Sequence, residues 1–344
     1  MRRTLAVLFF CLTSLPAFAA PYSGIYFFGD SLTDVGNVQN VYAHVPHSPG
    51  WPATIPGAPY DSGGRATNGP NYSDVVAQGL GFVSAPSTAG GNNYAFGGAR
   101  TRYQIFGQPF MGILSQIAAY TALPGAANST ALYVVWGGSN NLQDIIMGKS
   151  SDVFGNPIPN VAATVNDIVS GILALYAEGA REFLVPNAPD LGLTPRVSEL
   201  GTAAKVAAHQ LSLLYNGLLG AALSQLEASY AGLDIIGFDT YSLLNEVVAD
   251  PAAFGLSNTS DRCYTGDDST FTGGGSVCAN PDSYVFWDGI HPTKAVHAVL
   301  GNAMLAALQL QVPEPAIPAL LGLALLAAVI VLRLNRRLPI LTAS

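Results

Sequence analysis

Short apolar runs alternate with longer segments of helical periodicity along most of this chain. The short runs predict central strands at Ile25–Phe28, Leu132–Trp136, Phe183–Val185 and Asp234–Phe238. A further strand is expected from Phe82-Val83 together with the segment leading to Tyr94-Ala95. The longer segments predict helices at Val161–Glu178, Thr202–Tyr230 and Lys294–Leu310. Because strands separated by helical segments are typical of βαβ units, we expect an α/β fold, a three-layer α/β/α sandwich with a parallel sheet.

The segment Val38–Pro70 breaks this alternation. It is rich in proline, glycine, asparagine and aromatic residues, and it contains His44, His47 and Trp51. A ligand crevice is expected beyond the carboxyl ends of parallel strands, and long loops in compact domains are often functional. We therefore expect this insertion at the rim of the crevice, either in contact with substrate or as a surface loop without that role.

The first 20 residues have the pattern of an export signal. Arg2 and Arg3 precede an apolar run from Leu5 to Leu12, and the small residues Ala17-Phe18-Ala19-Ala20 follow. We interpret residues 1–20 as a signal peptide, so that the mature chain begins near Pro21. A buried first helix is the alternative, but it would not need a basic flank or a cleavage site of small residues.

The segment 312–344 holds a second apolar stretch. Val312-Pro313-Glu314-Pro315 precedes an uncharged stretch from Ala316 to Leu332, and three arginines follow it, Arg333, Arg336 and Arg337. A helix of about 17 apolar residues can just cross a bilayer, and the arginines would remain cytoplasmic. This order resembles the PEP-CTERM sorting tail of Gram-negative bacteria. The resemblance implies an exosortase-type processing partner and a location at the cell envelope or outer surface; a permanent membrane anchor is the alternative.

Residues 21–311 lie between these segments and are enough for one large α/β domain. The chain has 14 basic and 22 acidic residues, and because five of its arginines and one acidic residue lie in the two terminal segments, the remainder is near −12. Such a domain repels phosphate backbones, so nucleic acid is a poor partner. Cys263 and Cys278 form an even pair, which in an oxidising compartment predicts a disulfide; two free thiols are the alternative.

Residues with catalytic potential occur where the first strand ends, at Gly29-Asp30-Ser31. Glycine permits a tight exit from the strand and places Ser31 at its carboxyl end. Taken alone, this turn could simply cap the next helix. A second segment, Asp288-Gly289-Ile290-His291, offers what a serine hydroxyl requires: a base that accepts its proton and an acid that orients the base.

Two further segments could donate hydrogen bonds to an oxyanion. Asn92–Ala99 offers a glycine N–H in a turn, and Trp136–Leu142 follows an apolar run and offers the side-chain amide of Asn140. Individually, each is an ordinary transition from strand to loop.

In this order, these segments resemble the GDSL (SGNH) family of esterases and lipases. The matching blocks are Phe28–Leu32, Gly64–Pro70, Asn93–Gly98, Gly138–Asn141 and Asp288–Pro292. The resemblance covers most of the mature chain and implies a flavodoxin-like sandwich, the SGNH hydrolase fold. It also implies a role for each site residue: Ser31 as nucleophile, His291 as base, Asp288 as the acid that orients it, and Ser31, Gly98 and Asn140 as oxyanion donors. Gly97 is an alternative to Gly98, and Asn141 departs from the aspartate usual in the family.

The resemblance further implies an exported serine esterase, either a general carboxylesterase or a lipase, that forms an acyl-enzyme without a metal or organic cofactor. His44 and His47 are too few ligands to argue for zinc. An extracellular polysaccharide O-deacetylase is an alternative. A surface or matrix protein that keeps the fold without turnover is an alternative of another class; the sorting tail motivates it, and the intact Ser31, Asp288 and His291 argue against it.

Overall fold

The computed structural model describes residues 22–45, 53–102, 112–125, 127–151, 157–269, 271 and 273–311. The expected signal peptide at 1–20 and the expected tail at 312–344 lie outside these ranges. The chain divides into two compact units, Met1–Leu305 and Ala306–Ser344, and all the strands belong to the first. No helix within the described ranges is long and apolar enough to cross a membrane.

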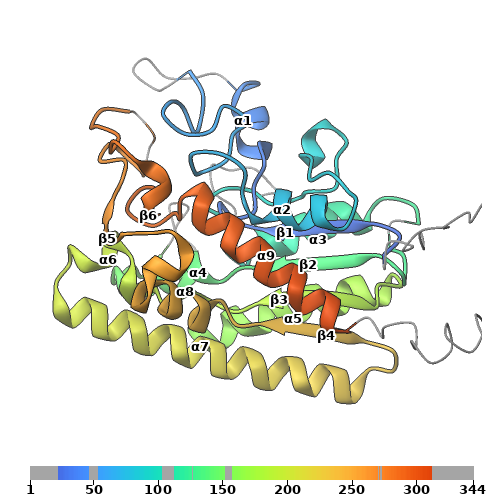
Figure 1. Ribbon diagram of the computed structural model, residues 1–344. Coiled ribbons are helices and arrows are strands. Elements are labelled where there is room, and N and C mark those ends of the chain that lie inside the picture. The colour runs from blue at the N-terminus through green and yellow to red at the C-terminus, as the bar shows by residue number, and fades with distance from the viewer. Residues whose placement is uncertain are drawn as a thin grey trace, which may run out of the picture. The chain divides into compact units, whose positions relative to one another are not determined.

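Four parallel strands form the central sheet (Figure 1). In spatial order they are β1 (Ile25–Gly29), β2 (Leu132–Trp136), β3 (Glu182–Pro186) and β4 (Asp234–Phe238). These are the four strands that the apolar runs predict. All five residues of β2 are buried, as expected where helices cover both faces of a parallel sheet. Gly29 pairs with Trp136, so β1 and β2 end at the same edge.

The further strand expected from Phe82-Val83 and the segment leading to Tyr94-Ala95 is found only in part: Phe82-Val83 forms no strand, whereas the second segment lies beside β1, where an isolated bridge joins Phe27 to Asn93. The Phe27 N–H donates to the Asn92 carbonyl at 3.1 Å, and the Tyr94 N–H donates to the Phe27 carbonyl at 2.8 Å. Asn93 forms a second bridge with Pro86, but the chain enters a 3₁₀ turn at Ser87–Ala89 directly afterwards. The expected strand is therefore reduced to isolated bridges.

Helices form a layer on each face of the sheet. On one face lie α3 (Ile113–Thr121), α4 (Ser139–Ile146), α5 (Val161–Ala177) and the long α7 (Thr202–Ser229) at the bottom of Figure 1. These helices pack with Phe28, Tyr133 and Val135 of the sheet in one large apolar cluster. Because side chains alternate along a strand, Val134 faces the opposite layer.

The opposite layer consists of α2 (Tyr72–Gly79), α8 (Thr240–Ala249) and α9 (Lys294–Gln311). The Tyr72 N–H donates to His297 Nδ1 at 3.3 Å, which joins α2 to α9. Val247 of α8 and Val296 of α9 share a second apolar cluster. The predicted helices α5, α7 and α9 are confirmed to within one residue at each end.

The remaining elements of the described chain are short. They are α1 (Asn37–Tyr42), α6 (Pro195–Ser198), β5 (Asn258–Arg262), β6 (Tyr284–Phe286) and the 3₁₀ turns η1 (Ser87–Ala89), η2 (Leu191–Leu193), η3 (Pro251–Phe254) and η4 (Pro281–Ser283). Strands β5 and β6 pair in parallel, apart from the central sheet.

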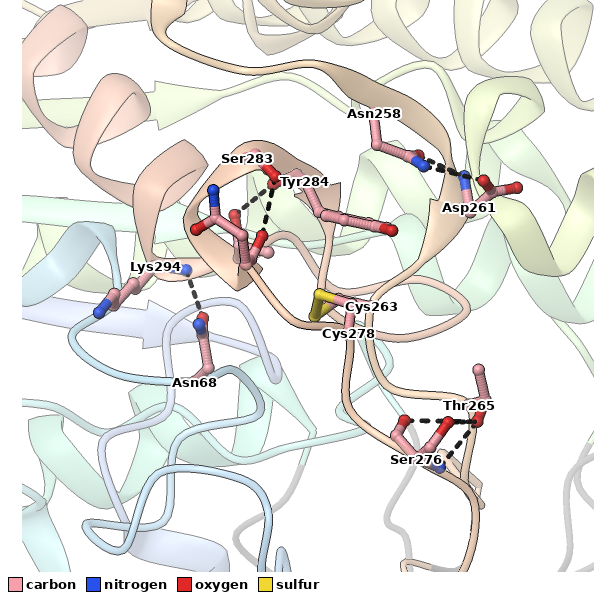
Figure 2. Close-up of a disulfide and its surroundings, with 12 residues drawn as sticks. Asn68, Asn258, Asp261, Cys263, Thr265, Ser276, Cys278, Ser283, Tyr284 and Lys294 are labelled. Atoms are coloured by element: carbon pink, nitrogen blue, oxygen red, sulfur yellow. Dashed lines mark hydrogen bonds between the residues drawn. A yellow bond between two sulfur atoms is a disulfide. The ribbon is translucent and has the colours of Figure 1, made fainter.

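A disulfide joins Cys263 to Cys278 directly after β5 (Figure 2). The Cys278 N–H donates to the Cys263 carbonyl, and Thr265 pairs with Ser276 at the base of the same loop. The Cys263 and Tyr264 N–H groups donate to the carbonyls of Phe286, the last residue of β6, and Trp287, which leads to Asp288. The disulfide loop, residues 263–278, is therefore attached to the segment that carries Asp288 and His291.

Candidate active site

Ser31 lies where β1 reaches the carboxyl edge of the sheet. The Asp30 carbonyl accepts the N–H groups of Thr33 and Asp34, which turns the chain sharply after the strand. A Cβ at Gly29 would lie 2.6 Å from Thr33 Oγ1 and 2.8 Å from the Trp136 carbonyl, so this exit from the strand requires glycine. Ser31 is half-buried and lines two cavities.

His291 and Asp288 lie beside Ser31, although His291 is 260 positions away in the sequence. His291 Nε2 is 2.8 Å from Ser31 Oγ, and His291 Nδ1 is 2.7 Å from Asp288 Oδ2. The other oxygen of Asp288 accepts the N–H groups of Ile290 and His291, both at 2.8 Å. Because an ionised carboxylate only accepts hydrogen bonds, Nδ1 carries the proton and Nε2 is free to accept that of Ser31. The structure thus brings together all three residues that the motifs predict.

Tyr60 is a fourth member of this group, and no motif in the sequence points to it. It lies in the Val38–Pro70 insertion, is buried, and donates its hydroxyl to Asp288 Oδ2 at 2.8 Å. Tyr60 packs edge-on against Tyr264 of the disulfide loop and Trp287. Part of the insertion therefore lies behind Asp288. Val38, Ile55 and Pro56, from the same segment, line the larger cavity.

Asp268 supports the same turn from the disulfide loop. Its Oδ2 accepts the Gly289 N–H at 2.8 Å, and its Oδ1 forms an ion pair with Arg196 at 2.9 Å. The main-chain N–H of Arg196 in turn donates to the Gly289 carbonyl at 2.7 Å. Both main-chain groups of Gly289 are therefore bonded, and the turn between Asp288 and His291 is held from outside.

The carboxyl groups beside Ser31 differ in their acidity. Burial raises the pKa of Asp288, but the charge on His291 and the hydrogen bonds from His291 and Ile290 outweigh it, so the net pKa is lowered. Burial dominates at Asp30 and raises its pKa to about 6. Burial and the nearby Asp288 raise the pKa of Tyr60, which therefore stays a neutral donor. Of the two aspartates, Asp288, which contacts His291, is thus the more acidic.

Three hydrogen-bond donors surround the space next to Ser31 Oγ. The Gly97 N–H already donates to Asp34 Oδ2 at 2.9 Å. Within the described chain, the N–H groups of Ser31 and Gly98 have no protein acceptor, and Gly98 has a φ of 75°, which favours glycine. Asn140 Nδ2 donates to the Ala99 carbonyl at 3.0 Å and lies 3.4 Å from Asp30 Oδ2.

Asn140 is placed by the turn from β2 into α4. Gly138 precedes α4 with a φ of 104°, and a Cβ there would lie 2.7 Å from the ring of Tyr215. The Tyr215 hydroxyl donates to the Gly137 carbonyl at 2.8 Å. The glycine allows close packing against Tyr215, which fixes the start of the helix that carries Asn140.

Asn141, the departure from the family pattern, is fully buried. Its Oδ1 accepts the Thr101 N–H at 3.0 Å, while its Nδ2 has no partner among the described residues. An aspartate would present an oxygen in place of this nitrogen. The amide therefore keeps the contact to Thr101 and leaves one buried donor unpaired, a destabilising arrangement.

Two cavities meet at Ser31 and share Asn140, Ile290 and His291 as lining residues. The smaller has a volume of about 80 Å³ and lies between α8 and α9. The larger has a volume of about 470 Å³ and lies between the Val38–Pro70 insertion, α4 and the disulfide loop. In the described ranges, no group of three His, Cys, Asp or Glu side chains could hold a metal ion.

A parallel α/β sandwich with serine, histidine and aspartate in hydrogen-bond contact at its carboxyl edge has the architecture of a serine hydrolase. Residues 25–304 match the model of the GDSL-like lipase/acylhydrolase family, and the chain belongs to that family. At the level of the family, this is a hydrolase that acts on esters.

Two plant proteins are similar to this chain over most of its length. The GDSL esterase/lipase At5g22810 of Arabidopsis thaliana is 28% identical over 82% of this chain and 88% of its own length. The anther-specific proline-rich protein APG of the same plant is 25% identical over 82% of this chain, which spans only 60% of APG. A crystal structure of a Lactobacillus plantarum protein matches at a TM-score of 0.44 and 14% identity, over 84% of this chain and 98% of that one.

Proposed function

We propose that this protein is a serine esterase that hydrolyses carboxylic esters through an acyl-enzyme on Ser31. The observation that supports this most is the continuous hydrogen-bonded series from Ser31 Oγ through His291 to Asp288. The pKa of Asp288 is lowered, which keeps this carboxylate ionised beside Nδ1 of His291, and Nε2 of the same ring faces the serine.

In the proposed reaction, His291 Nε2 takes the hydroxyl proton as Ser31 Oγ attacks the ester carbonyl carbon. The carbonyl oxygen becomes an oxyanion, and the N–H groups of Ser31 and Gly98 together with the Asn140 amide donate to it. The free N–H of Gly98, in contrast with the bonded N–H of Gly97, favours Gly98 for this role. His291 then gives its proton to the alkoxide that leaves, and water hydrolyses the acyl-enzyme by the same steps.

Export remains part of the proposal. The basic, apolar and small-residue pattern of residues 1–20 supports it, and a Cys263–Cys278 disulfide suits an oxidising compartment. Sorting at the envelope of a Gram-negative bacterium, with exosortase-type cleavage near Pro313-Glu314-Pro315, rests on the sequence of the tail alone. Intact-mass analysis of the protein from its native envelope tests this part separately, because cleavage removes Arg333–Ser344 and a permanent anchor keeps them.

The catalytic proposal is tested with p-nitrophenyl butyrate and the Ser31→Ala variant. We expect hydrolysis by the wild-type protein and a loss of about 10⁴ to 10⁶ in kcat in the variant, since the nucleophile is removed. Ser170→Ala, an exposed serine of α5, is the matched control and should leave kcat unchanged. A folded Ser31→Ala protein with more than a tenth of wild-type activity would assign the nucleophile elsewhere. An inactive wild-type protein would favour the non-catalytic alternative.

A further inference from the structure

The two cavities that meet at Ser31 differ in chemistry as well as in size. An ester has two substituents on its reacting carbonyl, the acyl chain and the alkoxy oxygen with its alcohol part. When the carbonyl lies between Ser31 Oγ and the oxyanion donors, these substituents extend into separate spaces. The character of each cavity then indicates which part of the ester it accepts.

The small cavity is lined almost wholly by apolar groups. Leu243, Leu244 and Val247 of α8 face Val296, Val299 and Leu300 of α9 across it. The hydroxyl of Thr240 already donates to the Asn187 carbonyl, and that of Thr194 donates to the Leu191 carbonyl. Such a wall favours an alkyl chain, because each methylene that enters it leaves water without taking a polar group from a partner.

The length of this cavity is set by the two helices that form it. Both begin at the carboxyl edge of the sheet, α8 after β4 and α9 just after His291. The lining residues of α8 run from Thr240 to Val247, which is about 10 Å at the rise of an α-helix. A fully extended chain advances roughly 1.2 Å per bond, so about eight carbons fill this depth.

The surface of the large cavity is also mainly apolar, but it carries more polar groups than that of the small one, and three of its side chains are basic. Arg100, Lys149 and Arg196 line it and are held by ion pairs with Asp144 or Asp268. These contacts leave further N–H donors on each guanidinium, since an arginine has five. Gln143 adds a side-chain amide whose oxygen accepts from Arg196 and whose nitrogen has no partner among the described residues. Fixed donors and acceptors around a volume of about 470 Å³ suit an alcohol that bears several hydroxyl groups.

We infer that the small cavity is the acyl site, selective for straight chains of up to about eight carbons, and that the large cavity binds a polyhydroxylated alcohol such as glycerol or a sugar. This inference rests on the proposed esterase function and adds its substrate class. Val299, half-buried on α9, is the residue that limits the acyl chain. Gln143, on α4, is a residue that selects the alcohol.

The acyl site is tested with p-nitrophenyl acetate, hexanoate, octanoate and dodecanoate. In the wild-type protein kcat/KM should rise from acetate to octanoate and fall at dodecanoate. Val299→Phe should lower kcat/KM for octanoate at least about tenfold and leave acetate unchanged, because lost methylene contacts carry this order of discrimination. Val206→Phe, at an exposed position of α7 that lines neither cavity, is the matched control and should reproduce the wild-type series.

Val299→Ala provides the opposite change, should the phenylalanine variant fail to fold. It lengthens the cavity and should raise kcat/KM for p-nitrophenyl dodecanoate relative to that for p-nitrophenyl hexanoate. For the alcohol site, the wild-type protein should prefer glyceryl monohexanoate to ethyl hexanoate, and Gln143→Leu should reduce this preference, measured as the ratio of the two kcat/KM values, about threefold to tenfold.

The outcomes separate the two proposals. A wild-type protein that hydrolyses none of these esters overturns the esterase function. An active wild-type protein whose chain-length series is unchanged by both Val299 variants overturns the acyl site while the esterase stands. Equal rates on the glyceryl and ethyl esters, or a preference that survives Gln143→Leu, overturns the assignment of the alcohol cavity.

Discussion

The two sides of the candidate active site are held in place in different ways. Ser31 and Asn140 follow directly from β1 and β2, and main-chain turns and packed glycines fix them to the sheet. Asp288 and His291 lie on a loop after β6, outside the central sheet, and side chains from remote segments hold that loop. The nucleophile side therefore depends on the fold of the sandwich, and the acid–base side depends on Tyr60, Asp268 and the disulfide loop.

This difference separates two kinds of damage. A change on the sheet side should affect the chemical step while the protein stays folded, because main-chain turns and packed glycines hold the backbone that carries Ser31 and Asn140. A change on the loop side should loosen the acid–base pair, so that stability and activity fall together.

After Ser31→Ala, the largest effect is expected on the sheet side, from Asn140→Ala. We expect kcat to fall about 10² to 10³ with KM little changed, because one donor to the oxyanion is removed. The melting temperature should stay close to that of the wild-type protein. Asn166→Ala, an exposed position on α5, is the control, and steady-state kinetics on p-nitrophenyl hexanoate is the measurement. An unchanged kcat would move the donor elsewhere.

On the loop side, the double variant Cys263→Ser/Cys278→Ser should lower the free energy of unfolding by about 3 kcal/mol, the chain-entropy value for a loop of this size. The two cysteines are 15 positions apart. Denaturant titration should show activity lost before the helical circular dichroism signal, since the loop that supports Asp288 opens first. Wild-type protein treated with reductant should behave as the variant does; coincident loss of both signals would mean that the loop and the sheet are equally stable.

Tyr60→Phe tests the link between the insertion and Asp288. The variant loses a hydrogen bond to a charged group, so the expected cost in stability is about 1.5 to 3 kcal/mol. It also removes one of the bonds that stabilise ionised Asp288, so the acid limb of the kcat against pH profile should move to higher pH. Tyr264→Phe is a close control, because its buried hydroxyl has no partner in the described residues and lies in the same aromatic cluster. Equal profiles for the two variants would contradict a positioning role.

The smallest effect is expected from Asp30→Asn on the sheet side. The pKa of Asp30 is raised to about 6, so the native state holds this proton more tightly than the unfolded chain does. The resulting stabilisation is present in acid and is lost as the pH rises through 6. Relative to the wild-type protein, the variant should therefore gain about 1.5 kcal/mol in unfolding free energy between pH 4.5 and 6.5. Urea titrations at the two pH values measure this gain, and a constant difference would contradict it.

The scaffold was largely predictable because its signals are local. Each central strand is an apolar run, and α5, α7 and α9 have long helical periodicity. No proline lies within these helices, and their glycines do not break them. The strand expected at Phe82-Val83 fails for a local reason as well, since the chain enters the turn η1 directly after Pro86 and the pairing is limited to isolated bridges.

The site was predictable only in part. Motifs identify the candidate catalytic residues, but they do not show which remote side chains hold those residues in position. Ser31, Asp288 and His291 stand in recognisable blocks. Tyr60 is 228 positions from Asp288 and lies in a loop without periodicity, so nothing in the sequence joins the two. The choice between Gly97 and Gly98 depends on which N–H is already bonded to Asp34, and that is a matter of tertiary contacts.

The separation of 260 positions between Ser31 and His291 also has a consequence in time. A ribosome adds about 5 to 20 residues per second, so the base follows its nucleophile by roughly 13 to 50 s. During that interval the serine lacks the imidazole that would activate it, whatever part of the sheet has already formed. Under the proposed mechanism, the nascent chain is therefore inert toward esters around it, and reactivity arises only when the segment that carries His291 joins the one that carries Ser31.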